Sequence, residues 1–273
     1  MIEKIHEKNV WDSLIKTTLP IVIYGMGNGA DMIIEKLQSI GVDFADIFAS
    51  DEFVRGHSFH GKKVLKYSEV QEKYNDFVIV MAFAVHDKKM LARVKELSKE
   101  HTLYFPDVPV VGDGIFSREY IKEHDSEFDK AYSLLSDEKS RQSYIDVLNF
   151  KVSGKTEYLF KCEREKEEIY SDYLCPGDNE IIMDLGAYDG DTIRELLNVT
   201  DNKYQKIYAV EADEKNFKKL FDKTSELSRT ERFNLAAWDK KETLFFEKKM
   251  GRNSKLSSFG KIKVDANSVD GIL

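Results

Sequence analysis

The sequence has few cysteines, no long apolar run and no excess of positive charge. Its two cysteines, Cys162 and Cys175, form no C-x-x-C pair, which argues against a disulfide scaffold and a zinc knuckle. No apolar run approaches the roughly 18 residues that a membrane span needs, and the polar N-terminus carries no secretion signal. The net charge of −8 argues against a nucleic-acid-binding face. We therefore expect a cytoplasmic protein with no metal site and with neither a membrane nor a nucleic acid as partner.

What the sequence does contain is a repeated order of strand, glycine turn and helix. The 273 residues are enough for two domains. In the first part, strands are expected at Ile21–Tyr24, Phe44–Ala49 and Phe77–Val85, followed by a short strand in "TLYF". Strands that alternate with helices indicate a parallel, doubly wound sheet. The fold class is therefore α/β, with residues 1–116 forming a Rossmann-like domain.

The middle of the chain, residues 117–175, is charged and has apolar residues every three or four positions, which predicts a helical connector. The order of strand, turn and helix then restarts in residues 176–273. Strands are expected at Glu180–Leu185 and Lys206–Asp213, with two more in "RFNLAAW" and "TLFFE". We expect about four strands in this third part.

The first glycine loop follows the strand Ile21–Tyr24 and fits the G-x-G-x-x-A pattern of dinucleotide-binding turns. The residues that would form a nucleotide site here are Gly25, Gly27, Asn28, Gly29 and Asp51. Asp51 comes just past the second expected strand, at the spacing from Ala30 where an acid can bind a ribose hydroxyl. The same glycines can instead serve only a tight turn and close helix packing, and both interpretations stay open.

Three histidines of the first domain are further candidates for site residues. His57 and His60 have no third ligand nearby, so a polar surface loop, "RGHSFHGKKVL", is expected rather than a metal site. His86 follows the strand Phe77–Val85, at the edge where open α/β sheets bind ligands.

The second glycine loop, in "IIMDLGAYDGDT", is rich in acids. Asp184, Asp189 and Asp191 would repel a pyrophosphate, so this loop favours a neutral or cationic ligand. Glu211 ends the next strand, at the spacing from Gly190 where a carboxylate can bind both ribose hydroxyls. An acid-rich loop with a ribose-binding acid fits S-adenosylmethionine, which carries adenosine, a sulfonium and an ammonium group. A carboxylate that only braces the loop is the alternative for Asp184.

The segments "DLGAYDGDT", "AVEADEKNFKKL", "FNLAAWDKKETLFFE" and "VDANSVDGIL" together resemble the FkbM family of class I S-adenosylmethionine-dependent methyltransferases. The resemblance covers roughly residues 179–273, and the helical lead-in resembles longer members that carry an N-terminal Rossmann-like domain. It implies S-adenosylmethionine as cofactor and O-methylation of a sugar or polysaccharide-type hydroxyl. The acceptor would be a small molecule or a saccharide.

The resemblance also implies the roles of individual residues. The cofactor-binding set would be Asp184, Gly186, Ala187, Tyr188, Asp189, Gly190, Asp191, Thr192, Glu211, Ala212, Asp213, Asn234 and Ala236. The loop from Gly186 to Gly190 would line the methionine and ribose portions, and Thr192 can also satisfy free N–H groups at the helix start. Ala212, Asp213, Asn234 and Ala236 would border the adenine. For Asn234, a hydrogen bond at the strand end is an equal alternative.

The chain departs from the family pattern at its end. Family members continue past the "VDGIL"-like stretch into further strands, whereas this chain stops at Leu273. We expect either a truncated or a reduced methyltransferase sheet, with an open central edge through which a homo-oligomer can form.

Two other functions stay open from the sequence. One is an NAD-dependent oxidoreductase that uses the Gly25 loop, although no catalytic Ser/Tyr/Lys set or Cys/His pair lies beside that loop. The other is a non-catalytic protein that binds a nucleotide or nucleotide-sugar and acts as a scaffold. The catalytic residues themselves are not predicted.

Overall fold

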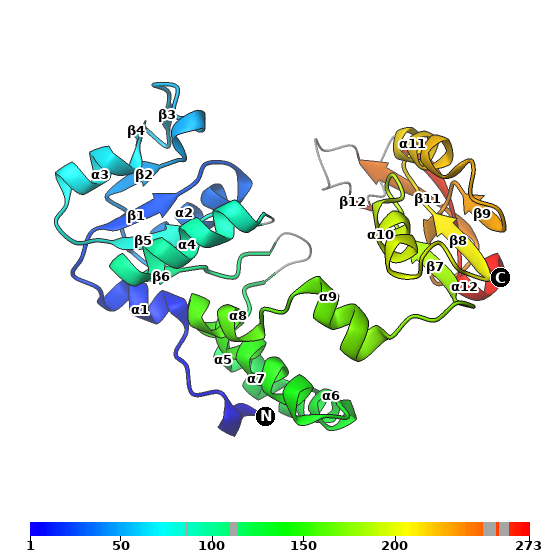
Figure 1. Ribbon diagram of the computed structural model, residues 1–273. Helices are drawn as coiled ribbons and strands as arrows, with labels where there is room; N and C mark the ends of the chain where they lie inside the picture. Colours follow the sequence, from blue (N-terminus) through cyan, green and yellow to red (C-terminus); the bar gives the residue numbers. More distant parts are fainter. Residues whose placement is uncertain (86, 110–113, 248–254, 257–261) are drawn as a thin grey trace. The chain divides into compact units, whose positions relative to one another are not determined.

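A computed structural model describes residues 1–85, 87–109, 114–247, 255–256 and 262–273 of the chain. The chain divides into two compact units, Met1–Glu163 and Arg164–Leu273. Figure 1 draws the first unit from blue to green and the second from green to red. The helices of the expected connector fall in both units, and the boundaries expected at residues 116 and 175 stay predictions.

The first unit is built on a six-stranded sheet in the order β3-β4-β2-β1-β5-β6. Its strands are β1 (Ile21–Tyr24), β2 (Asp46–Phe48), β3 (Ser58–Phe59), β4 (Lys62–Leu65), β5 (Val78–Met81) and β6 (Leu103–Tyr104). Its helices before and between strands are α1 (Val10–Lys16), α2 (Asn28–Ser39), α3 (Tyr67–Lys73) and α4 (Lys88–Glu100). Only the pair β3–β4 is antiparallel, so the Rossmann-like parallel sheet expected here is confirmed.

Alternate residues of β1 point to opposite faces of this sheet, and helices cover both faces. Ile21 and Ile23 belong to a core cluster with residues of α1 and α2. Val22 and Tyr24 belong to a second cluster with residues of α3 and α4. Because both faces are buried, β1 is apolar at every position rather than at every second one.

Four further helices complete the first unit. They are α5 (Arg118–Glu123), α6 (Asp125–Leu134), α7 (Glu138–Ser153) and α8 (Thr156–Cys162). Met1 and Ile5 at the N-terminus share a core cluster with Ile121 of α5 and Leu148 of α7, so the start of the chain packs on these helices. No helix in the described part of the chain combines the length and apolar character needed to cross a bilayer.

The second unit begins with α9 (Lys166–Glu168), which continues into a π-helix, Ile169–Leu174. A three-stranded parallel sheet follows, in the order β7-β8-β9, and a four-stranded sheet in the order β10-β13-β11-β12. The strands are β7 (Ile181–Leu185), β8 (Lys206–Val210), β9 (Thr230–Phe233), β10 (Ala236–Ala237), β11 (Glu242–Glu247), β12 (Lys255–Leu256) and β13 (Ile262–Asn267). The helices are α10 (Asp191–Val199), α11 (Glu214–Thr224) and α12 (Val269–Ile272).

The parallel sheet of the second unit packs against α10 and α11. Ile193 of α10, Leu220 of α11 and Ile207 of β8 are fully buried in one core cluster. The edge of β7 opposite β8 has no strand partner among the described residues. Ile181 and Leu185 of β7 accordingly remain 58% and 47% exposed.

Several strand expectations are wrong in detail. The stretch "RFNLAAW" does not form one strand, because it divides between β9 and β10, which belong to different sheets. The expected four strands of this part are too few, since β12 and β13 pair with β11. In the first unit, the polar stretch "RGHSFHGKKVL" forms the β3–β4 hairpin, and the third strand ends at Met81 rather than Val85.

Candidate cofactor site

The predicted cofactor residues gather at the carboxyl ends of β7, β8 and β9. The parallel register pairs Asp184 with Ala209 and Leu185 with Val210. Val210 in turn pairs with Phe233 of β9. Glu211 therefore follows β8 directly beside the start of the Gly186 loop, at the edge where open α/β sheets bind ligands.

The backbone of the glycine loop is tied to the end of β8. The N–H groups of Gly186 and Ala187 both donate to the carbonyl oxygen of Val210, at 2.8 and 2.9 Å. Gly186 has a φ of +89°, a conformation that side chains with a Cβ rarely adopt, and a Cβ built there would meet no atom within 4 Å. The loop thus turns sharply and leaves open space above Gly186, while Ala187 beside it is buried.

Gly190 closes the loop for a different reason. It is the N-cap of α10, with a φ of +81°. A Cβ at this position would lie 3.0 Å from Thr224 Cγ2 and 3.2 Å from Leu220 Cδ1. The absence of a side chain therefore allows α10 to start close against α11, and Gly190 serves packing rather than ligand access.

Glu211 is buried and holds two loops with its carboxylate. Its Oε2 accepts the N–H of Tyr188 at 2.9 Å, and its Oε1 accepts the N–H of Asp213 at 2.8 Å. An ionised carboxylate has about four acceptor sites, so each oxygen keeps one more for a ribose hydroxyl. The two backbone bonds fix the orientation that a bidentate ribose contact requires.

Asp184 is the unsatisfied group of the site. Its Oδ2 is buried and has no hydrogen-bond partner among the described residues. Burial raises the pKa of this carboxyl, and the negative charges of Asp191 and Glu211 raise it further. A cation or a hydrogen-bond donor placed here would relieve both the missing bond and the repulsion.

Asp189 has the opposite environment, although it lies only five residues after Asp184. Its carboxylate binds Lys223, and its Oδ1 lies 3.2 Å from the guanidinium of Arg194. The hydrogen bond from Lys223 lowers the pKa of Asp189, and Arg194 lowers it further. Asp189 thus braces the loop against α10 and α11, a role that the sequence reasoning missed because Lys223 is distant from it in the chain.

Three other predicted residues lie at the starts of helices. Asp213 caps α11, because its Oδ1 accepts the N–H groups of Lys215 and Asn216, both at 3.0 Å. Asp191 and Thr192 are exposed at the start of α10. The cap expected from Thr192 is wrong, since Gly190 is the N-cap and the N–H of Thr192 itself donates to Oδ1 of Asp191 at 3.1 Å.

The sequence left two roles open for Asn234, a contact with the adenine and a hydrogen bond at the strand end, and the structure shows the hydrogen bond. Its Nδ2 donates to the carbonyl oxygens of Glu211 at 2.9 Å and Ala212 at 3.3 Å. These bonds tie the end of β9 to the end of β8. Ala236 is buried in β10, where it pairs with Ala266 of β13.

Comparison with known proteins places this geometry in a known fold. No protein-family model matches the sequence, and no curated protein matches it. One similar solved structure is the methyltransferase FkbM from Methylobacillus flagellatus KT, with 19% sequence identity and a TM-score of 0.64. The alignment covers 98% of this chain and 73% of that one. This chain has the fold of an FkbM methyltransferase.

The resemblance inferred from the sequence is therefore confirmed at the level of the fold, and the similarity includes the N-terminal Rossmann-like part that was expected of longer family members. In this methyltransferase fold, Asp184, Gly186 and Glu211 come together as predicted at one sheet edge. Whether each predicted residue contacts a cofactor stays a prediction, because the fold does not establish ligand contacts.

The first glycine loop is explained largely by packing. A Cβ on Gly25 would lie 2.6 Å from the ring of Phe83, and one on Gly29 would lie 2.2 Å from the carbonyl oxygen of Ala82. These two glycines let α2 approach the end of β5. Only Gly27, the N-cap of α2 with a φ of +128°, faces open space.

The other two residues of that predicted nucleotide site are both exposed. Asn28 is exposed and its Nδ2 lies 3.7 Å from the sulfur of Met32, while Asp51 is exposed in a short 3₁₀ helix after β2. His57 and His60 contact Met26 and Asp31 respectively. The described residues include no group of three metal-ligating side chains, and His86 lies outside them.

Proposed function

We propose that this chain binds S-adenosylmethionine at the Gly186 loop and transfers its methyl group to a hydroxyl of a saccharide-type acceptor. The observation that carries the proposal is the buried Oδ2 of Asp184, which has no hydrogen-bond partner among the described residues and is repelled by the charges of Asp191 and Glu211. This arrangement disfavours a phosphate and favours a cationic ligand. The methyltransferase fold supports the same interpretation.

The residues present fit this cofactor. The open space above Gly186 leaves room for a ligand against the backbone of the loop. Asp184 offers a carboxylate to the ammonium or sulfonium group. Glu211, already oriented by two backbone N–H groups, offers the free lone pairs of both oxygens to the two ribose hydroxyls.

When bound, S-adenosylmethionine supplies a methyl carbon whose bond to sulfur breaks as the acceptor oxygen attacks, and S-adenosylhomocysteine and the hydroxyl proton leave. The chain would contribute alignment, because Glu211 would hold the ribose and Asp184 the methionine portion of the ligand at one edge of the sheet. A cation beside Asp184 would lower its raised pKa and so favour the ionised form of this carboxyl.

The test is calorimetric titration of S-adenosylmethionine and S-adenosylhomocysteine into the whole chain and into an Asp184→Asn variant. We expect micromolar binding to the wild type and about 10- to 100-fold weaker binding to the variant, because a charge-assisted hydrogen bond contributes about 1.5–3 kcal/mol. NAD, whose pyrophosphate is anionic, should not compete.

The matched control is Asp222→Asn, which removes the same charge from the exposed side of α11. Its affinity should equal that of the wild type. Wild-type protein that binds neither ligand, or Asp184→Asn protein that binds both as tightly as Asp222→Asn protein, would contradict the proposed cofactor site.

A further inference from the structure

Tyr188 has a strained backbone in the middle of the Gly186 loop. Its φ is +47°, in the left-handed region that residues with a large side chain rarely adopt. Its N–H donates to Oε2 of Glu211 at 2.9 Å. Strained residues of this kind persist only where their surroundings hold them, and they are concentrated at functional sites. The contacts that hold Tyr188 therefore also decide how Glu211 is oriented.

Two lysines of α11 contact this strained segment. Lys219 and Lys223 are spaced i, i+4, so they lie on one face of the helix. The Nζ of Lys219 lies 5.5 Å from the centre of the Tyr188 ring, which is a cation–π contact. Lys223 binds the carboxylate of Asp189, the next residue of the loop. One face of α11 thus holds both the side chain of Tyr188 and the residue that follows it.

The ion pair between Lys223 and Asp189 is partly shielded from solvent. The side chain of Asp189 is only 15% exposed, so water and salt screen this pair less than they screen a fully exposed one. Arg194 binds the same residue twice, because it donates to the carbonyl oxygen of Asp189 at 2.8 Å and to its Oδ1 at 3.2 Å. Asp189 is therefore held through its backbone and its side chain, which restrains the rotation of Tyr188 before it.

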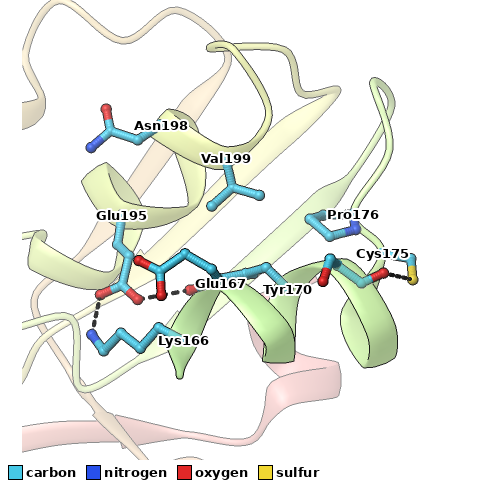
Figure 2. Close-up of a pocket in the computed structure, with 9 residues that line it drawn as sticks. Lys166, Glu167, Tyr170, Cys175, Pro176, Glu195, Asn198 and Val199 are labelled. Atoms are coloured by element: carbon cyan, nitrogen blue, oxygen red, sulfur yellow. Dashed lines mark hydrogen bonds and ion pairs between the residues drawn. The ribbon is translucent and has the colours of Figure 1, made fainter. Parts of the chain in front are cut away.

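The two helices that supply these contacts are themselves anchored. Figure 2 shows Lys166 and Tyr170 reaching toward Glu195 of α10. The Nζ of Lys166 lies 2.7 Å from one carboxylate oxygen of Glu195, and the hydroxyl of Tyr170 lies 3.2 Å from the other. At the end of α11, Arg232 of β9 donates to the hydroxyl and to the carbonyl oxygen of Thr224. The loop is thus braced between two anchored helices.

We infer that Lys219 and Lys223 are positioning residues of the cofactor site. They hold Tyr188 in the conformation in which its N–H orients the carboxylate of Glu211 for the ribose hydroxyls. Loss of either lysine lets Tyr188 relax to a negative φ, which turns its N–H away from Glu211. The inference rests on the proposed function, because the ribose is that of S-adenosylmethionine. It assigns control of cofactor affinity to a face of α11.

The first measurement is hydrogen exchange of the Tyr188 amide, followed by NMR in the free chain. The amide should be protected in the wild type by its bond to Glu211, and it should exchange about tenfold faster in the Lys219→Met and Lys223→Met proteins. Lys223→Arg keeps the positive charge and should keep the wild-type rate. The matched control, Lys218→Met, removes the same charge from an exposed position of α11 and should also exchange like the wild type. Thermal unfolding of each variant shows whether it is folded.

The second measurement is calorimetric titration of S-adenosylhomocysteine into the same proteins. We expect about tenfold weaker binding to the Lys223→Met protein and wild-type affinity in the Lys218→Met protein. The decisive comparison repeats Lys223→Met in a Tyr188→Asn background, because asparagine adopts the left-handed region at a lower cost. There the loss of Lys223 should change the affinity by about twofold or less. A lysine that only stabilises the fold would have the same effect in both backgrounds.

Two results would overturn the inference while leaving the cofactor site in place. One is an exchange rate of the Tyr188 amide that neither lysine variant changes, and the other is an effect of Lys223→Met on affinity that is absent or equal in both backgrounds. Wild-type protein that does not bind S-adenosylhomocysteine refutes the proposed function instead. The positioning role falls with it, even where the exchange rates differ, and Lys223 is then a brace of the fold alone.

Discussion

Replacing Asp184 by asparagine should stabilise the second unit, although it should weaken the binding of the cofactor. The buried Oδ2 of Asp184 has no partner among the described residues, and Asp191 and Glu211 add negative charge nearby. The substitution keeps the size of the side chain but removes its charge. The amide can also donate a hydrogen bond to a neighbouring carboxylate.

An unsatisfied buried polar group costs about 1–3 kcal/mol. Asp184 is only half-buried, so solvent screening reduces this to about 1 kcal/mol. For a unit of this size, that gain corresponds to a rise in melting temperature of about 4 °C. Asp189→Asn is the control of opposite sign, because it removes the partner of Lys223 and Arg194 and should lower the melting temperature by a similar or smaller amount.

The stability gained by the Asp184→Asn substitution should also depend on pH. Because the folded-state pKa of Asp184 is raised, the native state binds a proton more tightly than the unfolded state, and the cost is full at pH values above the raised pKa. The advantage of Asp184→Asn should therefore be largest at neutral pH and disappear as the pH falls toward the ordinary value of 3.8. The pKa of Asp189 is lowered, so its contribution is present at neutral pH and is lost on acidification.

The two tryptophans provide the assay, because Trp11 lies in the first unit and Trp238 in the second. In a Trp11→Phe background, fluorescence during heating reports the unfolding of the second unit alone. An Asp184→Asn protein that melts at or below the wild-type temperature at neutral pH would refute the reasoning. So would a difference between the two proteins that does not depend on pH.

Three further substitutions follow from the packing. Gly186→Ala should lower the free energy of unfolding of the second unit by about 1–2 kcal/mol because of its φ of +89°. It should also weaken S-adenosylmethionine binding, because the new methyl group fills the open space. A melting temperature and a calorimetric affinity equal to those of the wild type would contradict this. Gly29→Ala should destabilise only the first unit, by about 1–3 kcal/mol, because its Cβ would lie 2.2 Å from the carbonyl oxygen of Ala82. Trp11 fluorescence would report the lower melting temperature. Calorimetry should show an unchanged affinity for the cofactor. Asn234→Ala should lower the melting temperature reported by Trp238, because the carbonyl oxygens of Glu211 and Ala212 lose their hydrogen-bond donor, at a cost of about 1 kcal/mol in the free energy of unfolding. Weaker cofactor binding without a change in melting temperature would instead favour direct contact of Asn234 with the ligand.

The strands with strong apolar patterns were predictable from the sequence. Ile21–Tyr24 has the predicted bounds, and Ile181–Leu185 differs from its expectation by one residue at the start. Each is a run of mostly apolar residues followed by a glycine, and each begins a buried or partly buried parallel sheet. Local composition sufficed for Ile21–Tyr24 because helices cover both faces of its sheet and bury all four side chains. Ile181–Leu185 is more exposed, but its apolar run before a glycine turn still predicted a strand.

The division of "RFNLAAW" was not predictable from periodicity. A continuous strand through this stretch has an acceptable pattern, but the side chain of Asn234 binds two carbonyls at the end of β8. That contact joins segments that are distant in the sequence, and the chain leaves the parallel sheet there. The β3–β4 hairpin was missed for another reason, because Val64 is the only buried residue of β4 and the apolar pattern is therefore weak.

Some features of the candidate site were likewise predictable from the sequence, and others were not. The sequence placed Asp184, Gly186 and Glu211 together, because a parallel sheet brings strand ends to one edge. It did not predict different roles for Asp184 and Asp189, which have the same side chain and lie five residues apart. The difference comes from Lys223 on α11, and only the three-dimensional packing brings that residue to Asp189.

The carboxylates around Asp184 also make ligand binding a proton-exchange event. A carboxyl whose pKa is raised in the free protein takes up its proton at a higher pH than an ordinary aspartate does. A bound cation lowers that pKa, so the proton is expelled to the buffer as the ligand enters. The heat of association will then depend on the ionisation enthalpy of the buffer, and the size of that dependence measures how strongly the empty loop holds its proton.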